Sequence, residues 1–519
     1  MSNNLETQLS EYAKSPAYPF HMPGHKRIMN PMNAAAAEDA LAGDTDDSSA
    51  AKTHFLGVYG IDITEIDGFD NLHDPQEILK TEMERASKLW GARKTWFSVN
   101  GSTCAMLVAI SAAVPKGGRI HIERGCHMSV YHAAYLRELS LSYIDSNAEE
   151  VQAVSEIPEG TDAVVITSPS YEGAVRDIQL WANAAHEKGA LLIVDEAHGA
   201  HLGFHPYFPE SAVRLGADLV AQSTHKTLPA MTQTALLHAA SDRVDIRKAA
   251  FFFDIYETSS PSYVLMASIT AAMHLLENRR QELFDDYVRR LVKVRSRLSS
   301  LTHFSLDGGS VQEMSGEDRK RFDPGKLVIR VKYPGSCHLY EGREVCPDGS
   351  WLYELLRLKY HLQMEMRAPD YVLAMTSIAD TDEGFDRLTC AMEEIDRALA
   401  LTGDEKEGAA GTDSSAGSAK KAQCREAPET TAAIKKGLAL PRCSLPMFEA
   451  CEVKSELVPL EQAAGRIAAD FVILYPPDAP LIVPGEEFNM DLIQAILSYR
   501  ERGFQIIGAD DNSVLCAET

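Results

Sequence analysis

The chain has 519 residues, of which 45% are hydrophobic and 24% are charged, and its formal net charge is −25. This length and composition indicate a globular protein of several domains with a large buried core. The acidity argues against a nucleic-acid partner, because phosphate contacts need clustered Lys and Arg side chains. It agrees with a small cationic ligand, although acidity that merely keeps the protein in solution is the simpler interpretation.

The cysteines and the hydropathy pattern bear on the compartment. Nine cysteines occur without CxxC spacing, and their odd number argues for reduced thiols rather than a disulfide framework. The first residues lack a basic start followed by an apolar segment, and no apolar run approaches the roughly 20 residues of a membrane helix. We therefore expect a cytoplasmic protein with no membrane partner.

The pattern predicts an N-terminal arm at residues 1–60, followed by a large domain at 61–300. Near the start of that domain, a strand at 96–99 runs into Asn100-Gly101-Ser102-Thr103 and a helix of small residues at 104–113. The free N–H groups and the dipole of such a helix N-terminus favour a phosphate. A plain helix cap, which Ser and Thr also provide, is the alternative.

Strands and helices then alternate. Apolar strands are predicted at 119–122, 163–167 and 191–195, with a helix at 178–188 before the last of them. This alternation predicts an α/β fold with a mostly parallel sheet covered on both faces. Polar clusters recur at the strand ends, which is where such sheets gather a ligand site.

Two of these polar residues suggest a cofactor. Asp195 ends the apolar run 191–195, and Lys226 lies among small hydroxyl residues just after the short apolar run 217–221. A lysine that forms an imine, with an acidic partner for a protonated ring nitrogen, is the arrangement that pyridoxal phosphate (PLP) requires. A surface lysine and a helix-capping aspartate remain the alternative, and the spacing alone does not separate the two.

The rest of the chain predicts smaller units. Residues 251–263 are expected to form an aromatic loop, followed by a helix to about 278 and a basic amphipathic helix at 283–300 whose charged face is solvated. Strands at 327–332 and 371–376 and helices at 350–360 and 383–400 predict a small α+β domain at 301–401. Few large apolar residues occur between 402 and 436, so we expect a flexible linker there, followed by a separate C-terminal α+β domain at 437–519.

Two other interpretations of the same region are weaker. Asp195-Glu196-Ala197-His198 resembles the magnesium-binding segment of a helicase, but that function needs a GxxxxGK[ST] loop, and Pro324-Gly325-Lys326 lacks the rest of it. Asp195, His198, His201 and His205 could form a metal site, yet Gly199 and Gly203 make a shared helix face doubtful. We therefore expect no metal.

Several segments in the same order resemble the bacterial Orn/Lys/Arg decarboxylases, which are fold-type-I PLP enzymes of the aspartate-aminotransferase type. The similarity covers nearly the whole chain apart from the 402–436 linker, and it is closest to the shorter, Bacillus-type, arginine decarboxylase-like group without an N-terminal wing domain. The segments are Pro-Gly-His-Lys (23–26), Asp-Ile-Thr-Glu (62–65), Gly-Phe-Asp-Asn-Leu-His (68–73), Asn-Gly-Ser-Thr (100–103), Cys-His-Met-Ser (126–129), Ser-Pro-Ser-Tyr-Glu-Gly (168–173), Asp-Glu-Ala-His-Gly-Ala-His (195–201), Ser-Thr-His-Lys-Thr (223–227), Ser-Ser-Pro-Ser-Tyr (259–263) and Tyr-Pro-Pro-Asp-Ala-Pro-Leu-Ile-Val-Pro-Gly-Glu (475–486).

The resemblance implies a role for each matched residue. Lys226 would form the internal aldimine, Asp195 would hold the pyridinium proton, and His127 would stack on the ring. Lys226 or His225 would return the proton to carbon, and His198 would lie near the ring hydroxyl. Ser102, Thr103, Ser223 and His225 would hold the phosphate, and Ser260 would reach the phosphate of a partner subunit, so a homodimer or an assembly of dimers is expected.

The family's substrates are basic amino acids, and carboxylates are needed to receive their cationic ends. The candidates are Glu65, Asp67, Asp70 and Glu257. Arg367 departs from the family pattern, which has a small residue there; either a surface role or a clamp on a substrate carboxylate would explain it. Met128 replaces a lysine that is more usual in the family, and this affects only local ring contacts.

Three functions follow as hypotheses. The first is decarboxylation of arginine, or alternatively of lysine, to make a polyamine precursor or to support acid resistance. The second is another fold-type-I PLP activity, such as an aminotransferase or a C–C lyase, for which Arg367 is the best evidence. The third is a regulatory subunit without activity, against which the intact set of lysine, aspartate and histidine residues argues.

Overall fold

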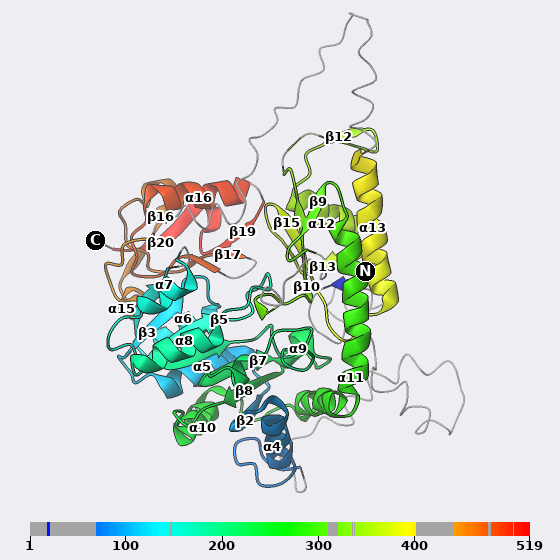
Figure 1. The fold of residues 1–519 in the computed structure, drawn as a ribbon. Helices are drawn as coiled ribbons and strands as arrows, with labels where there is room; N and C mark the ends of the chain where they lie inside the picture. Colours follow the sequence, from blue (N-terminus) through cyan, green and yellow to red (C-terminus); the bar gives the residue numbers. More distant parts are fainter. Residues whose placement is uncertain are drawn as a thin grey trace, which may run out of the picture.

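We describe the protein from a computed structural model. The described residues are 18–20, 69–145, 148–309, 320–334, 336, 338–400, 440–475, 479–501 and 503–518. The predicted linker at 402–436 and nearly all of the predicted arm at 1–60 lie outside them. The rest forms a large α/β part, a small α+β part and a C-terminal part (Figure 1).

The large part is built on a seven-stranded sheet of order β2-β8-β7-β6-β5-β3-β4. Only β8 runs against its neighbours, so the expected mostly parallel sheet is confirmed. In that order the strands are Lys94–Ser98, Ala235–Ala239, Leu219–Ser223, Leu191–Asp195, Ala163–Thr167, Arg119–Glu123 and Ser140–Ile144.

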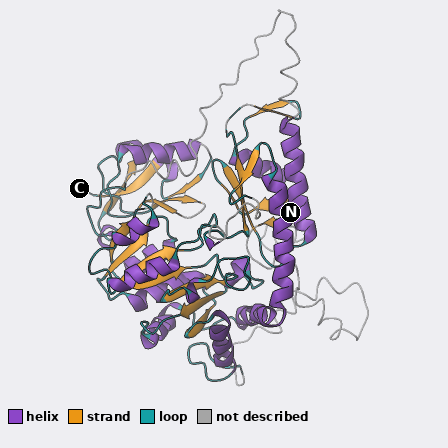
Figure 2. Ribbon diagram, viewed as in Figure 1, coloured by secondary structure: helices purple, strands orange, loops and turns teal. Residues whose placement is uncertain are grey.

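Short apolar runs form the central strands because both faces of the sheet are covered by helices (Figure 2). All five residues of β7 and of β8 are buried. The helices are α4 (Ile78–Trp90), α5 (Gly101–Ala113), α6 (Met128–Leu136), α7 (Glu150–Ser155), α8 (Ile178–Glu187), α9 (Thr224–Thr227) and α10 (Ile246–Tyr256). Helix α5 is almost entirely apolar or small, since it packs between the sheet and the helices α6 and α10.

Two predictions about the following segment differ from the structure. Of the expected aromatic loop at 251–263, residues 251–256 end helix α10, which Asp245 caps and in which Phe252 and Phe253 are buried, while 257–262 form the connection to the next helix. The two helices predicted up to residue 300 are one helix, α11 (Tyr263–Ser299), which links the large and the small parts. Its basic face is not simply solvated, because Arg295 is completely buried.

The small part contains a four-stranded antiparallel sheet of order β14-β15-β10-β9, covered by α11, α12 and α13. In Figure 1, α11 and α13 run side by side. Strand β1 (Tyr18–Phe20) pairs in parallel with β13 (Leu362–Met364). The other elements are β9 (Phe304–Leu306), β10 (Lys326–Val331), β11 (His338–Tyr340), β12 (Arg343–Val345), α12 (Gly349–Leu358), β14 (Met366–Arg367), β15 (Tyr371–Met375) and α13 (Asp382–Ala400).

The C-terminal part has its own hydrophobic core, formed by residues between Val458 and Cys516. Its elements are α15 (Met447–Ala450), β16 (Ser455–Pro459), β17 (Val472–Tyr475), β18 (Ala479–Ile482), α16 (Met490–Glu501), β19 (Gln505–Ile507) and β20 (Ser513–Ala517). Arg124 joins it to the large part through a buried, two-pronged ion pair with Glu486. None of the helices in the described part of the chain is long and apolar enough to cross a membrane.

Candidate active site

The C-terminal ends of the parallel strands gather at one edge of the large sheet, and most of the predicted site residues lie there. Asp195 is the last residue of β6, and Ser223 is the last residue of the adjacent β7. Lys226 follows in α9, His127 caps α6 after β3, and Ser102 lies in the first turn of α5 after β2. This is the edge at which open α/β sheets bind their ligands.

Lys226 is the buried amine of this group. Its Nζ lies 3.1 Å from His198 Nε2, and burial lowers its pKa, although the negative charges of Asp195 and Glu365 act in the opposite direction. A lowered pKa leaves more of the amine neutral at neutral pH, and the neutral amine is the nucleophilic form. The site therefore suits a lysine that forms a covalent bond with a carbonyl carbon.

The carboxylate of Asp195 is buried, with 5% of the residue exposed. Its Oδ1 accepts a hydrogen bond from the backbone N–H of Ala197, 3.1 Å away, which fixes its orientation. A buried carboxylate needs a positive partner or several donors. The backbone N–H of Ala197 is one such donor, and the protonated nitrogen of a bound ring would supply the positive charge.

A group of donors suited to phosphate lies beside this pair. The hydroxyl of Ser223 is completely buried and makes no hydrogen bond within the described structure, which marks a place for a ligand atom. The 13-residue helix α5 begins at Gly101, and its Ncap residue Asn100 gives no side-chain hydrogen bond to the first turn. Ser102 is half-buried and Thr103 is exposed there. These residues fit the phosphate end of PLP.

Two histidines complete the predicted set. The Nδ1 atom of His127 accepts a hydrogen bond from the N–H of Ser129 at 3.1 Å, so the ring is held at the start of α6. The Nδ1 atom of His225 lies 2.9 Å from the carbonyl oxygen of Thr234 and donates to it, which leaves the proton off Nε2 in the neutral ring. Both side chains act electrostatically on His198, so the structure brings them to the same site.

Of the four predicted substrate carboxylates, the structure describes Asp70 and Glu257, and both bind groups of the protein itself. Asp70 accepts hydrogen bonds from the backbone N–H groups that open α4, including those of Glu77 and Leu79. Glu257 is buried and accepts from Ser98 Oγ at 2.7 Å and from the N–H of Val99 at 3.0 Å. Both contacts organise the backbone. The other two candidates, Glu65 and Asp67, lie outside the described residues.

The structure adds a carboxylate that the sequence analysis missed. Glu365 lies between β13 and β14 of the small part, and its charge acts on Lys226. Tyr171 Oη donates a hydrogen bond to Glu365 Oε1 at 2.6 Å, and the Tyr171 ring lies 4.7 Å from the His198 ring, centroid to centroid. In this segment the sequence analysis singled out Arg367, whereas Glu365, two residues earlier, is the residue that lies near Lys226.

Arg367 and Ser260 lie in different surroundings. Arg367 donates a hydrogen bond to the carbonyl oxygen of Gly503 at 3.2 Å and lies 3.8 Å from Glu354, so it bridges α12 and the C-terminal part. Ser260 is exposed in the turn between α10 and α11. In this chain neither residue is seen to contact Lys226.

The histidines after Asp195 diverge rather than converge. His198 lies by Lys226, His201 by the buried Asp323 at 3.3 Å, and His205 by Asp285 at 3.1 Å. Within the described ranges, no three His, Cys, Asp or Glu side chains form a group that could hold a metal ion.

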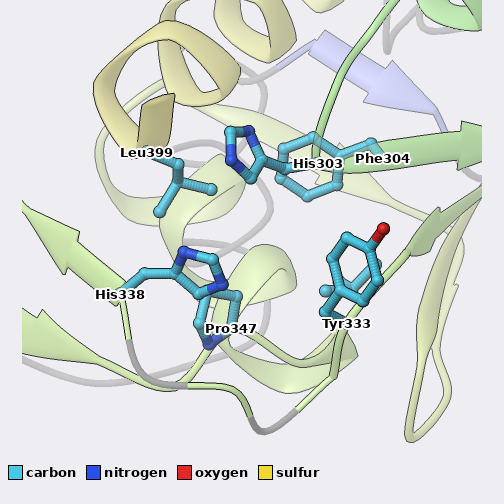
Figure 3. A pocket seen from close by; sticks show the side chains of 7 residues that line it. His303, Phe304, Tyr333, His338, Pro347 and Leu399 are labelled. Atoms are coloured by element: carbon cyan, nitrogen blue, oxygen red, sulfur yellow. The ribbon is translucent and has the colours of Figure 1, made fainter. Parts of the chain in front are cut away.

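One pocket belongs to a different region. It lies in the small part, where the rings of His303 and His338 approach each other at 5.6 Å (Figure 3). Its lining comes from β9, β10, β11, α13 and the neighbouring loops, and it includes none of the predicted site residues. This pocket is therefore separate from the candidate site, which consists of the groups around Lys226.

Comparisons with known proteins agree with this geometry. Residues 4–315 match the model of the Orn/Lys/Arg decarboxylase major domain, and residues 444–505 match that of the Orn/Lys/Arg decarboxylase C-terminal domain. The chain is 27% identical to an arginine decarboxylase of Bacillus anthracis, over 98% of this chain and 95% of that protein.

Two solved structures support the fold. The constitutive lysine decarboxylase of E. coli superposes with a TM-score of 0.70 at 18% identity, over 99% of this chain and 81% of that one. A structure of SPT with PLP as an internal aldimine superposes with a TM-score of 0.51 at 13% identity, over 74% of this chain and 88% of that one. At these identities the superpositions establish the fold, and they confirm the predicted fold type.

Proposed function

Because the chain belongs to the Orn/Lys/Arg decarboxylase family, we propose that it uses PLP to remove the α-carboxylate of a basic amino acid as CO2, with arginine favoured. The observation that carries the proposal is the placement of Lys226 beside Asp195 at the ends of adjacent strands, next to the unpartnered hydroxyl of Ser223. Lysine is the second choice of substrate, in view of the lysine decarboxylases with the same fold.

Each residue then has a defined task. The amine of Lys226 would hold the cofactor covalently between turnovers. Asp195 would keep the proton on the ring nitrogen, and His127 would cover one face of the ring. Ser223, Ser102, Thr103 and His225 would bind the phosphate together with the N-terminus of α5, and His198 would stay in contact with Lys226. PLP itself supplies an electron sink for the pair released when the carboxylate leaves.

Glu365 is the described carboxylate best placed to receive the cationic end of the substrate. It lies close enough for its charge to act on Lys226, and Tyr171 holds one of its oxygens. A carboxylate offers a guanidinium two parallel acceptors, whereas an ammonium needs only a point charge. Arg367, by contrast, is engaged by Gly503 and Glu354, so the geometry does not favour amino transfer.

We further propose a cytoplasmic homodimer. Phe251 and Ile255 lie four residues apart on α10 and are both exposed, and Ser260 is exposed in the turn that follows this helix. Exposed apolar side chains on one helix face are typical of a protein interface. The reduced state expected of the cysteines agrees with the cytoplasm. Sedimentation of the PLP-loaded protein, with Phe251→Glu as the interface variant, tests the dimer; a wild-type monomer would contradict it.

The activity is tested by the release of CO2 and amine from arginine, lysine and ornithine, each supplied with PLP. Wild type is compared with Lys226→Ala and with the matched control Lys332→Ala, whose lysine bonds to the Leu301 carbonyl oxygen elsewhere in the fold. We expect one amine, agmatine first, from wild type and the control and none from Lys226→Ala. A folded, PLP-loaded wild type that releases no amine from any of the three would refute the proposal.

A further inference from the structure

Lys326 is a buried charged residue to which the proposed reaction assigns no role. It begins β10 in the small part, and only 1% of its surface is exposed. Its Nζ lies 2.7 Å from His198 Nδ1, while the other ring nitrogen of His198 lies 3.1 Å from Lys226. One imidazole therefore bridges two lysine amines, one from each part of the molecule.

The protonation state of His198 limits the protonation states that the two lysines can have. Burial lowers the pKa of His198 well below its ordinary value, and the charges of Lys226 and Lys326 lower it further, so the ring is neutral. A neutral imidazole has one N–H donor and one acceptor nitrogen, whereas an ammonium group can only donate. Both lysines cannot donate to His198 at once, and one of them must accept with its lone pair as a neutral amine.

The surroundings favour the charged form at Lys326. The carboxylate of Asp323, three residues earlier, is buried; burial acts to raise its pKa, but the hydrogen bond with His201, the nearby Lys326 and the N–H of Gly325 lower it. The face of the Tyr171 ring lies 6.0 Å from Lys326 Nζ, a favourable position for a cation. Asp195 and Glu365 act on Lys226 instead, but burial outweighs them there.

The loop that carries Lys326 is also held firmly. The guanidinium of the buried Arg295 donates to the carbonyl oxygens of Pro324 at 3.1 Å and of Lys326 at 3.3 Å. Asp323 Oδ1 accepts from the N–H of Gly325 at 2.9 Å. A side chain fixed in this way can impose a direction on the hydrogen bonds of its partner.

We propose that Lys326 is a positioning residue that fixes the proton of His198 on Nε2 and thereby keeps Lys226 as a neutral amine. The Lys326 ammonium donates to Nδ1 and the Nε2–H donates to Lys226, which accepts with its lone pair and therefore carries no third proton. When PLP binds, this hydrogen bond would open and the lone pair would attack the aldehyde carbon; a C=N bond would form, and the aldehyde oxygen would leave as water with the two amine hydrogens. The inference rests on the proposed function, since it assumes PLP.

The test is the rate at which the apo protein takes up PLP covalently over a pH series from about 6 to 10. Uptake is followed by absorbance, and reduction with borohydride followed by peptide mass analysis confirms attachment at Lys226. Wild type should titrate well below the ordinary lysine value of about 10.4. In Lys326→Met the midpoint should rise by about one unit or more, which slows uptake at pH 7 about tenfold.

Two further variants separate the explanations. Lys326→Arg keeps both donor and charge and should retain the low midpoint. Lys332→Met removes the same charge elsewhere and should behave as wild type. An unshifted midpoint in a folded Lys326→Met protein would overturn the inference. A wild-type midpoint at the ordinary lysine value would also overturn it, and that result does not depend on whether the variant folds. If the proposed function itself were wrong, neither the wild type nor any variant would take up PLP at Lys226, and this result differs from both outcomes above.

Discussion

Glu257 offers a sharp test, because a role in binding substrate and a role in organising the backbone predict opposite results for Glu257→Gln. Its Oε2 accepts from Ser98 Oγ at 2.7 Å and from the N–H groups of Val99 at 3.0 Å and Asn100 at 3.4 Å. These donors surround the turn that leads into α5, the helix whose N-terminus we assign to the phosphate. Glutamine cannot accept all of them with a charged oxygen.

The expected loss can be estimated from these bonds. A hydrogen bond to a charged group contributes about 1.5–3 kcal/mol, and the contributions do not add. Because glutamine keeps one acceptor, we expect Glu257→Gln to lower the free energy of unfolding of the large part by about 2–3 kcal/mol. A displaced turn should also weaken PLP binding about tenfold, which corresponds to about 1.4 kcal/mol.

Urea unfolding followed by tryptophan fluorescence measures the first effect, since Trp90, Trp96 and Trp181 are all buried in the large part. Titration of apo protein with PLP measures the second. The matched control is Asp254→Asn, an exposed carboxylate on the same helix that pairs with His73; it should change stability by less than about 0.5 kcal/mol. Unchanged stability and PLP affinity with a raised KM for the amino acid would refute the reasoning and return Glu257 to the substrate site.

Three more predictions follow from charged side chains. Burial raises the pKa of Glu196 to about 7, so the folded protein binds a proton there more tightly than the unfolded chain does. The free energy of unfolding should therefore fall by roughly 1–3 kcal/mol as pH rises from about 5 to 8, and this dependence should disappear in Glu196→Gln. The same pH dependence in both proteins would contradict the prediction. Arg124→Met leaves Glu486 buried without its partner and should lower the free energy of unfolding in urea by about 3–5 kcal/mol. The double variant with Glu486→Leu should recover much of this loss, and no recovery would argue against the ion pair. Arg367→Ala should leave the kcat of amine release within about twofold, because its contacts run to Glu354 and Gly503; a loss of about a hundredfold would restore the carboxylate clamp.

The sheet and the residues at its edge could be predicted from the sequence because they depend on local signals. The run that forms β6 is continuously apolar and ends in Asp195, and the hydroxyl residues after β7 stand next to Lys226 in the sequence. Helix α11 could not be predicted as one element, since its polar middle interrupts the apolar pattern. There Arg279 pairs with Glu282 on an exposed surface, so the helix continues without burial.

Glu365 and Lys326 were missed for a different reason. Both belong to strands or loops of the small part and reach the site only through the packing of that part against the large one. Nothing in their neighbouring residues distinguishes them: Lys326 was noticed only as part of an incomplete phosphate loop. Contacts between distant segments carry no local signature in the sequence, and only the folded chain brings these residues together.

The pairing of β1 with β13 has a consequence for how the protein is made. Tyr18 to Phe20 leave the ribosome before the large sheet, whereas their partner strand, Leu362 to Met364, follows only after the whole large sheet has been synthesised. Loop closure over such a separation costs entropy that the short pairing recovers only late. We expect the large part to fold first during synthesis, so that β1 pairs and Phe20 becomes buried only after β13 has been made.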